Sequence, residues 1–198
     1  MDAPLGIILA GGQATRMGGG DKCLLPLGGR PMLVRIIDRI EGQVGGLALN
    51  ANGDAARFAG YGLPVLADSI DGYAGPLAGV LAGLDWAHEM GARHVVSVAG
   101  DTPFFPLDLV ERLGRAADRA NTPIALAGTH EGGRSHRHPT FGLWPVALRD
   151  DLRRALNGGL RKVVMWTDAH GAATAPFDDD AFFNINTPED LDRAEDML

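Results

Sequence analysis

Several residue types are scarce in this chain of 198 residues, and each scarcity excludes a class of protein. The single cysteine, Cys23, rules out an internal disulfide and any metal site built from several cysteines, and it fits a reducing compartment. The longest stretches without Asp, Glu, Lys or Arg (Ala3–Thr15 and Gly72–Leu84) are shorter than the roughly 20 residues that a membrane-spanning helix needs. The start, Met-Asp-Ala-Pro, lacks the basic segment of a secretory signal. We therefore expect a cytoplasmic protein with no membrane partner.

Positive charge is scarce in the last part of the chain. The formal net charge is −7, and residues 167–198 hold nine acidic residues against Arg193 alone, so the remainder is close to neutral. This distribution argues against a basic face for binding nucleic acid. Among the first 40 residues, however, cations outnumber acids, which is compatible with a local anion site near the N-terminus.

The hydrophobic pattern predicts one α/β domain over residues 1–198. Short apolar runs alternate with helical patterns, which is typical of parallel βαβ units. We expect a doubly wound, mostly parallel sheet with helices on both faces. The predicted strands are Leu5–Ala10, Leu47–Asn50, Pro64–Ala67, His94–Ala99, Pro123–Ala127 and Pro139–Trp144.

Apolar residues at helical spacing predict the helices between these strands. The predicted helices cover about 32–40, 77–84, 109–117, 146–156 and 188–197, the last capped by Thr187 with Asp190 near a capping-box position. Arg161–Trp166 fits a strand or a helix. The polar segment Gly128–His138 is predicted to be a flexible loop over a site.

A glycine-rich segment follows the first predicted strand. Five glycines between Gly11 and Gly20 let the backbone approach a ligand closely, and Arg16 and Lys22 add charges suited to phosphates. The segment is neither a P-loop nor a standard dinucleotide fingerprint, because the spacing of glycines and lysine differs. The alternative is a surface turn whose cations are only solvated.

Polar side chains also follow later strands, where ligands bind in open parallel sheets. Asp101 comes after the fourth predicted strand, Asp68 after the third and Asn50 after the second. A carboxylate at such a position can hold Mg²⁺. The alternative for either Asp is a helix cap, and for Asn50 a local turn contact.

In the segment Arg134-Ser135-His136-Arg137-His138, the two histidines resemble a pair of metal ligands, but no third ligand is evident. Its two arginines and two histidines suit a cationic patch for a second anionic substrate, and a solvated loop is the alternative. No motif of a protein nucleophile is present, and Cys23 is expected to pack under the glycine-rich segment.

The segment LAGGQATRMGGGDKCLLPLGGRPML closely resembles the signature loop of nucleotidyltransferases, L-A-G-G-x-x-x-R-M-G-x-x-K-x-L. Within this group the chain is similar to the molybdenum cofactor guanylyltransferases. Supporting segments occur in the same order over nearly the whole chain: LNAN, LADS, GPLAG, AGDTPFFP, HPTFGLW and NINTPEDL. Cytidylyltransferases acting on the same cofactor typically read L-A-A-G, whereas this chain reads Leu9-Ala10-Gly11-Gly12. Cys23 stands where a glycine is expected.

This resemblance implies a Rossmann-like nucleotidyltransferase fold and a Mg²⁺-dependent reaction. The terminal phosphate of molybdopterin, or of its molybdenum-bearing form, would attack the α-phosphate of GTP and release pyrophosphate. Arg16, Lys22 and Asp101 would be catalytic, with Asp101 also holding Mg²⁺. The residues implied to bind GTP are Leu9, Ala10, Gly11, Gly12, Lys22, Asn50, Asp68 and Asp101.

The pterin side is expected in the second part of the chain. About 1–105 would bind GTP and about 106–198 molybdopterin, with Arg137, His138, Pro139, Thr140, Asn184 and Asn186 on the pterin side. We expect a monomer with transient contacts to proteins that supply or receive the cofactor. The alternatives are transfer from CTP or to a sugar phosphate, and a non-catalytic nucleotide-binding module; a redox Rossmann enzyme fits the glycine spacing less well.

Overall fold

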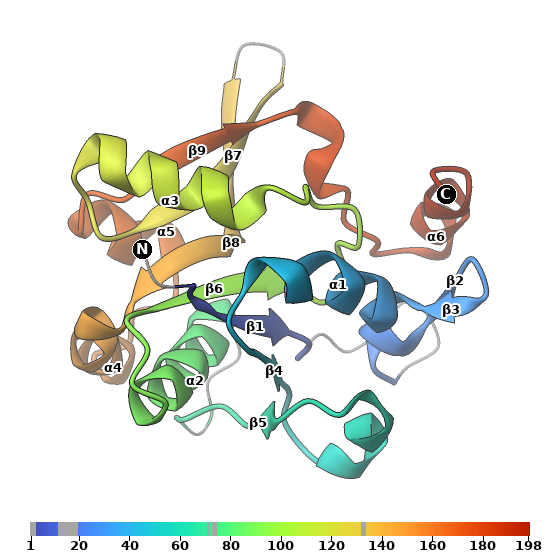
Figure 1. Cartoon of the computed structure of the whole chain (residues 1–198), viewed down its shortest axis with the longest axis horizontal. Helices are drawn as coiled ribbons and strands as arrows, with labels where there is room; N and C mark the ends of the chain where they lie inside the picture. The colour runs from blue at the N-terminus through green and yellow to red at the C-terminus, as the bar shows by residue number, and fades with distance from the viewer. Residues whose placement is uncertain (1–2, 12–19, 71, 73–74, 132–133) are drawn as a thin grey trace.

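A computed structural model describes residues 3–11, 20–70, 72, 75–131 and 134–198, and it contains a seven-stranded sheet (Figure 1). The strand order is β5-β4-β1-β6-β8-β7-β9. Only β8 runs antiparallel to its two neighbours, and every other pair in this sheet is parallel. The predicted mostly parallel sheet is therefore confirmed. The strands are β1 (Leu5–Leu9), β4 (Leu47–Asn50), β5 (Val65–Leu66), β6 (His94–Ala99), β7 (Ala125–Glu131), β8 (Arg134–Pro145) and β9 (Ala173–Phe177).

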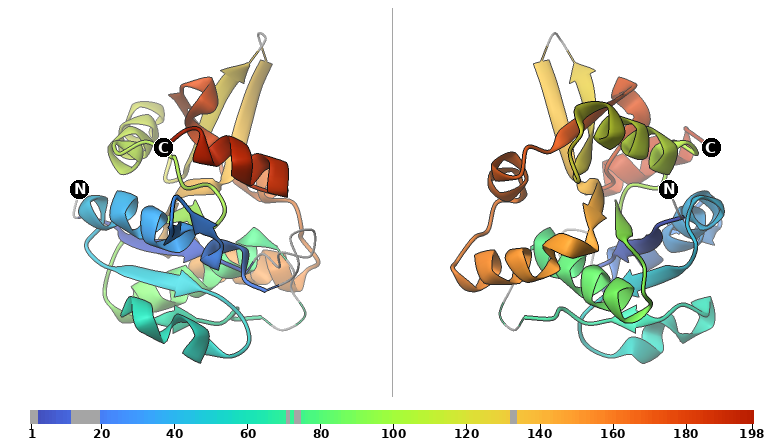
Figure 2. Two further views of the ribbon diagram at one scale, coloured as in Figure 1. Left: turned by 90° about the vertical axis from the view of Figure 1, so that its right-hand side faces the viewer. Right: turned by 60° about the vertical axis from the view of Figure 1, so that its left-hand side comes forward.

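Helices cover both faces of the sheet, as the hydrophobic pattern predicts (Figures 1 and 2). Successive side chains on a strand point to opposite faces, so Ile8 joins the core under α1 and α3, while Ile7 joins the core under α2, α4 and α5. The helices are α1 (Met32–Ile40), α2 (Pro76–Glu89), α3 (Leu109–Ala120), α4 (Arg149–Asn157), α5 (Val163–Ala169) and α6 (Pro188–Glu195).

Short elements connect the longer strands and helices. The two-stranded hairpin β2 (Pro26–Leu27) and β3 (Arg30–Pro31) lies beside α6, where the Gly28 N–H donates to Glu195 Oε1 at 2.8 Å (Figure 1). The 3₁₀ helices are η1 (Lys22–Leu24), η2 (Glu41–Gln43), η3 (Ala55–Tyr61), η4 (Val146–Leu148) and η5 (Asp179–Phe182). Within the described residues, no helix is both long and apolar enough to cross a bilayer.

One prediction needs correction, and one strand was not predicted. The segment Gly128–His138 is not a loop, because its described parts are the paired ends of β7 and β8, with Gly128 opposite Arg137 and Thr129 opposite His136. Its polar character comes from its position, since this hairpin projects beyond the helical layers (Figure 2). The strand β9 was not predicted; its sequence, ATAPF, is short and contains a proline, which is tolerated because β9 is an edge strand. The ambiguous segment at 161–166 contributes to the helix α5.

Candidate active site

A cleft of about 670 Å³ lies at the carboxyl ends of β1, β4, β5 and β6. This is the edge at which open parallel sheets bind ligands. Its position brings together side chains from loops that are far apart in the sequence. The lining residues are Leu9, Gly11, Asp21, Asn50, Asn52, Arg57, Asp68, Gly75, Pro76, Ala99, Asp101, Thr140 and Asn184.

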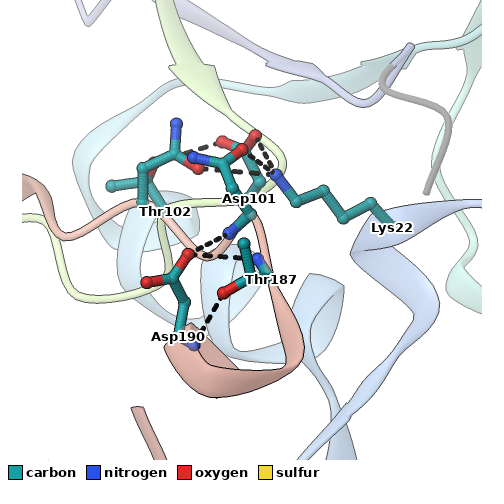
Figure 3. Close-up of polar contacts among 7 residues, drawn as sticks. Lys22, Asp101, Thr102, Thr187 and Asp190 are labelled. Carbon is teal, nitrogen blue, oxygen red and sulfur yellow. Dashed lines mark hydrogen bonds and ion pairs between the residues drawn. The ribbon is translucent and has the colours of Figure 1, made fainter. Parts of the chain in front are cut away.

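Lys22 is held at the edge of this cleft by three oxygen atoms. Its Nζ lies 2.9 Å from Asp101 Oδ2, 2.6 Å from Asn186 Oδ1 and 3.5 Å from Asn184 Oδ1. Figure 3 shows the ammonium pointing at Asp101. Lys22 is only 8% exposed, so this is a buried cation with an acceptor for each of its three N–H groups. The lysine of the glycine-rich segment is therefore fixed by groups from β6 and from the chain before α6.

The segment that carries Asn184 and Asn186 is itself fixed by the start of α6. The Asp190 carboxylate accepts from the backbone N–H of Asn186 and Thr187 at 2.9 and 3.0 Å, and the Thr187 hydroxyl accepts from Asp190 N (Figure 3). These hydrogen bonds lower the pKa of Asp190, and the one from the Asn186 N–H makes the largest contribution. The predicted cap is confirmed as a full capping box, and it anchors the two asparagines next to Lys22.

Asp101 does not cap the helix that follows it. The N-cap position of α3 is Asp108, seven residues further on, while Asp101 accepts hydrogen bonds from Lys22 and from the Thr102 hydroxyl. Its backbone carbonyl also accepts from the Ile185 N–H at 3.0 Å. The helix-cap alternative is therefore excluded, and the Asp101 side chain faces the cleft.

The opposite end of the cleft is a cluster of one carboxylate and two carboxamides. Asn50 Nδ2 donates to Asp68 Oδ1 at 3.0 Å, and Asn52 Nδ2 donates to Asp68 Oδ2 at 2.8 Å. Asn52 Oδ1 in turn accepts from the Asp68 N–H at 2.9 Å. Both carboxylate oxygens are thus oriented by amide donors and keep further acceptor capacity toward the cleft.

Gly79 of α2 makes this arrangement possible. A Cβ atom at position 79 would lie 2.2 Å from Asn50 Oδ1 and 2.7 Å from Leu9 Cδ2, closer than atoms can pack. The glycine therefore allows α2 to lie directly against the Asn50 side chain. The same helix begins at the cleft with Gly75 and Pro76, and no side chain of the described residues caps its first turn.

Among the polar residues that line the cleft, the sequence reasoning missed Asp21, Asn52 and Arg57. Arg57 Nε lies 2.5 Å from Asp21 Oδ2, and its Nη2 donates to the Asn52 carbonyl at 2.6 Å. Arg57 thereby joins the chain just before Lys22 to the chain just after β4. Asn52 could have been found from the sequence, because it lies two residues after Asn50 at a strand end. Arg57 lies in the 3₁₀ helix η3, and no sequence pattern indicated that it reaches the cleft.

The predicted pterin residues do not all reach the cleft. Thr140 lines it, but Arg137 contacts Asp168 and Thr174 on the side of α5 and β9. His138 stacks on Phe182 with centroids 4.5 Å apart and contacts the Thr129 hydroxyl at 3.0 Å. Burial, and then the nearby His136, lowers the pKa of His138, so its ring is neutral at pH 7. The predicted cationic patch is therefore not seen at the cleft among the described side chains.

The remaining predicted residues lie at the cleft, near the acceptor side or outside the described part of the chain. Leu9 and Gly11 line the cleft, and Ala10 is buried beside it with its N–H on the Asn50 carbonyl. Pro139, between His138 and Thr140, is half-buried. Gly12 and Arg16 lie outside the described residues.

The oxygen atoms around Lys22 Nζ are of the type that a divalent cation prefers, but the ammonium already fills the space between them. Asp101 Oδ1, which the ammonium does not engage, is the carboxylate oxygen left for a metal ion beside Lys22. Mg²⁺ prefers carboxylate and amide oxygens and usually takes only one or two protein carboxylates. Asp101, Asn184 and Asn186 supply this donor set around a cation, the lysine ammonium. Among the described residues, no three His, Cys, Asp or Glu side chains form a metal-binding group, so a metal here would need water and substrate oxygens as well.

Cys23 is not a candidate nucleophile. Its side chain is 2% exposed, and burial, followed by the charge of Asp21, raises the pKa of its thiol to about 12. It stays protonated at neutral pH and packs in the core. Residues 12–19 of the glycine-rich segment, under which Cys23 was predicted to pack, lie outside the described residues.

The chain is similar to known proteins over most of its length. Residues 6–172 match the model of the MobA-like NTP transferase domain. A molybdenum cofactor guanylyltransferase from Bradyrhizobium sp. (strain ORS 278) is 52% identical over 96% of this chain and 91% of that protein. One from Cereibacter sphaeroides is 51% identical over 98% of this chain and 96% of that protein.

Solved structures extend the likeness to the fold. Molybdopterin-guanine dinucleotide biosynthesis protein A from Archaeoglobus fulgidus has a TM-score of 0.76 at 23% identity and covers 98% of this chain and 97% of its own. The 4-diphosphocytidyl-2C-methyl-D-erythritol synthase from Anaerococcus prevotii has a TM-score of 0.78 at 14% identity, covering 100% of this chain and 96% of its own. With the extensive sequence match over residues 6–172, the chain belongs to the MobA-like NTP transferase family.

Proposed function

We propose that this protein transfers GMP from GTP to the terminal phosphate of molybdopterin or of its molybdenum-bearing form. The acceptor phosphate oxygen bonds to the α-phosphorus of GTP, and the bond from that phosphorus to the bridging oxygen breaks, releasing pyrophosphate. The products are the guanine dinucleotide form of the cofactor and pyrophosphate. The relatives at about 50% identity support this assignment, because they carry the name of the same activity.

The observation that carries the proposal is the layout of one cleft. An amide-and-carboxylate cluster at the ends of β4 and β5 lies at one end, and the Lys22–Asp101 pair lies at the end of β6. A nucleobase needs hydrogen-bonding groups such as the amide-and-carboxylate cluster, and a triphosphate needs charged groups such as the Lys22–Asp101 pair. No protein nucleophile is needed, because the acceptor phosphate is itself the nucleophile.

Lys22 and Asp101 act on the phosphates in this proposal. Lys22 offers a fixed ammonium to neutralise the charge that grows on the departing pyrophosphate. Asp101, with amide oxygens near it, would hold Mg²⁺, and the bound ion supplies charge neutralisation at phosphate oxygens. The catalytic role of Arg16 remains part of the proposal on the strength of its place in the signature loop.

In this proposal Asp68 recognises the guanine base of GTP. Guanine presents two adjacent N–H donors, and a carboxylate oriented by Asn50 and Asn52 can accept them. Cytosine and adenine lack this pair of donors, so they would leave polar groups unpaired, which costs binding energy. Leu9, Ala10, Gly11 and Gly12 complete the proposed GTP site.

The acceptor side is assigned to Thr140, Asn184 and Asn186, with His138 and Pro139 beside them. The division at about residue 105 is kept only in part, because Asn184 and Asn186 also contact Lys22 of the nucleotide side. Arg137 is the weakest member of the set, since Asp168 and Thr174 already engage it. The proposal retains a cytoplasmic location and a monomer, and size-exclusion chromatography checks the second.

The test is pyrophosphate release from GTP, CTP, ATP and UTP, each with and without molybdopterin, in the presence of Mg²⁺. We expect release only with GTP and acceptor together. Equal release from CTP would favour the cytidylyl alternative. Nucleotide binding with no release from any of the four would instead support a non-catalytic binding module.

A further inference from the structure

A chain of two hydrogen bonds runs through the core beneath the cleft. Trp144 Nε1 donates to Ser97 Oγ at 2.8 Å, and Ser97 Oγ donates to the Thr140 carbonyl at 2.8 Å. Ser97 and Trp144 are both completely buried. The direction of the chain is fixed, because an indole N–H can only donate and the serine then has its single hydrogen left for Thr140.

Thr140 needs this contact because it lies in an irregular part of β8. His138 pairs with Ala127 of β7, and the next paired residue of β8, Gly142, lies opposite Leu126. Pro139, Thr140 and Phe141 therefore have no partner on β7 and form a bulge. The ladder between β6 and β8 also ends at Ser97 opposite Gly142, so the Thr140 carbonyl accepts from a side chain instead of a strand backbone.

The bulge brings Thr140 into the cleft with Asp101 and Asn184. Within the described residues, the Thr140 hydroxyl has no hydrogen-bond partner, so it is free to donate to a ligand. In the strand order, β8 lies beyond β6 on the side away from β4 and β5. Thr140 is thus separated from the Asn50–Asp68 cluster by the end of β6, where Asp101 stands.

We propose that Ser97 and Trp144 are positioning residues that hold the Thr140 bulge so that its hydroxyl donates to the phosphate of the acceptor substrate. This inference rests on the proposed function. It assigns a specificity-determining contact to the acceptor side, where charged side chains from the predicted cationic patch are not seen at the cleft. A neutral hydroxyl suits this place, because the phosphate must keep enough negative charge to act as a nucleophile.

The test is steady-state kinetics of the full chain with GTP and molybdopterin varied separately. We expect Thr140→Val to raise the KM for molybdopterin roughly tenfold, about the value of one hydrogen bond to a charged group, with the KM for GTP nearly unchanged. Ser97→Ala should raise the same KM by a similar factor. In the double variant the two effects should not multiply, because both remove one contact.

Two further variants separate positioning from simple destabilisation. Trp144→Phe keeps an aromatic ring in the core and the Ser97–Thr140 bond but removes the indole N–H, so we expect a smaller rise in the molybdopterin KM than in Ser97→Ala. Ser135→Ala, at an exposed position of the same strand, should leave both KM values unchanged. A Ser97→Ala variant that melts earlier but keeps the wild-type KM for molybdopterin would overturn the inference, as would a rise in the KM for GTP instead.

The proposed function is tested separately by the wild-type protein. If molybdopterin binds in a direct titration but no pyrophosphate forms, the transfer reaction is wrong, while the titration still shows whether Thr140→Val and Ser97→Ala weaken acceptor binding. If the wild-type protein does not bind molybdopterin at all, both proposals fail.

Discussion

The nucleotide side and the acceptor side of the cleft are built in different ways. On the nucleotide side, the ends of β1, β4, β5 and β6 are parallel and adjacent, and contacts between neighbouring strand ends, such as Asn50 to Asp68, orient the polar groups. On the acceptor side, the antiparallel strand β8 contributes a bulge and a late segment contributes Asn184 and Asn186. The first construction repeats one rule at each strand, whereas the second depends on irregular backbone and long-range contacts.

The two constructions suit different roles in binding and catalysis. A parallel strand end can place a charged group only near its own strand, which suits fixed contacts to a base and phosphates. A bulge can re-aim a single side chain without moving the rest of the sheet. We therefore expect changes on the nucleotide side to affect catalysis or folding strongly, and changes on the acceptor side to affect mainly substrate binding.

The largest effect is expected for Asp101→Asn, at the boundary between the two sides. The change keeps the shape but removes the charge, and metal-derived stabilisation of a transition state is worth several kcal/mol, so kcat should fall on the order of 1,000-fold. Pyrophosphate release at saturating Mg²⁺ measures this. The control Asp108→Asn, at the start of α3, should keep full activity. Near-normal turnover of Asp101→Asn would refute the metal assignment.

A smaller loss, of about 100-fold in kcat, is expected for Lys22→Met, because one fixed charge beside the phosphates is removed. The only other lysine, Lys162, is exposed, and Lys162→Met should behave like the wild-type protein. The buried contacts of Lys22 predict some loss of stability as well, measurable by urea unfolding. A variant that unfolds readily but, when folded, retains full turnover would show that Lys22 is structural.

Gly79→Ala tests the nucleotide side without removing any polar side chain, because it only displaces Asn50. The added methyl would collide with Asn50 Oδ1, so we expect weaker GTP binding by isothermal titration and a loss of about 1–3 kcal/mol in the free energy of unfolding. Gly114→Ala is the matched control, since no atom lies within 4 Å of a Cβ there, and it should gain up to about 1 kcal/mol. Unchanged GTP affinity in Gly79→Ala would contradict the role given to Asn50.

The smallest effect concerns His138 on the acceptor side. Because burial lowers its folded-state pKa below the ordinary value of 6.5, the unfolded state binds the proton first as the pH falls. The free energy of unfolding should therefore decrease as the pH falls from 6.5 to the lowered pKa. Below that pKa, His138 should cause no further decrease. Urea unfolding between pH 8 and 5 should give a shallower decline for His138→Gln than for the wild type. The same slope in both proteins would contradict the shift.

Sequence reasoning found the nucleotide side because that side follows one geometric rule. Asn50 is the last residue of a strand, Asp68 and Asp101 each stand two residues after one, and the structure places all three in the cleft. Arg137 shows where reasoning from composition fails: neighbouring residues on a strand point to opposite faces, so Arg137 reaches Asp168 while His138 packs on Phe182. The contact of Asn186 with Lys22 depends on how the chain returns after β9, which periodicity alone does not determine.

The contact between Lys22 and Asn186 also has a consequence for how the protein is made. The two residues are 164 positions apart, so the lysine leaves the ribosome long before its carboxamide partner is synthesised. Until then Lys22 and Asp101 face each other without the segment that α6 anchors, and the cleft lacks one of its walls. Completion of the site therefore waits for the segment that carries Asn184 and Asn186, and a chain interrupted shortly before residue 184 would lack two of the three oxygen atoms that hold Lys22.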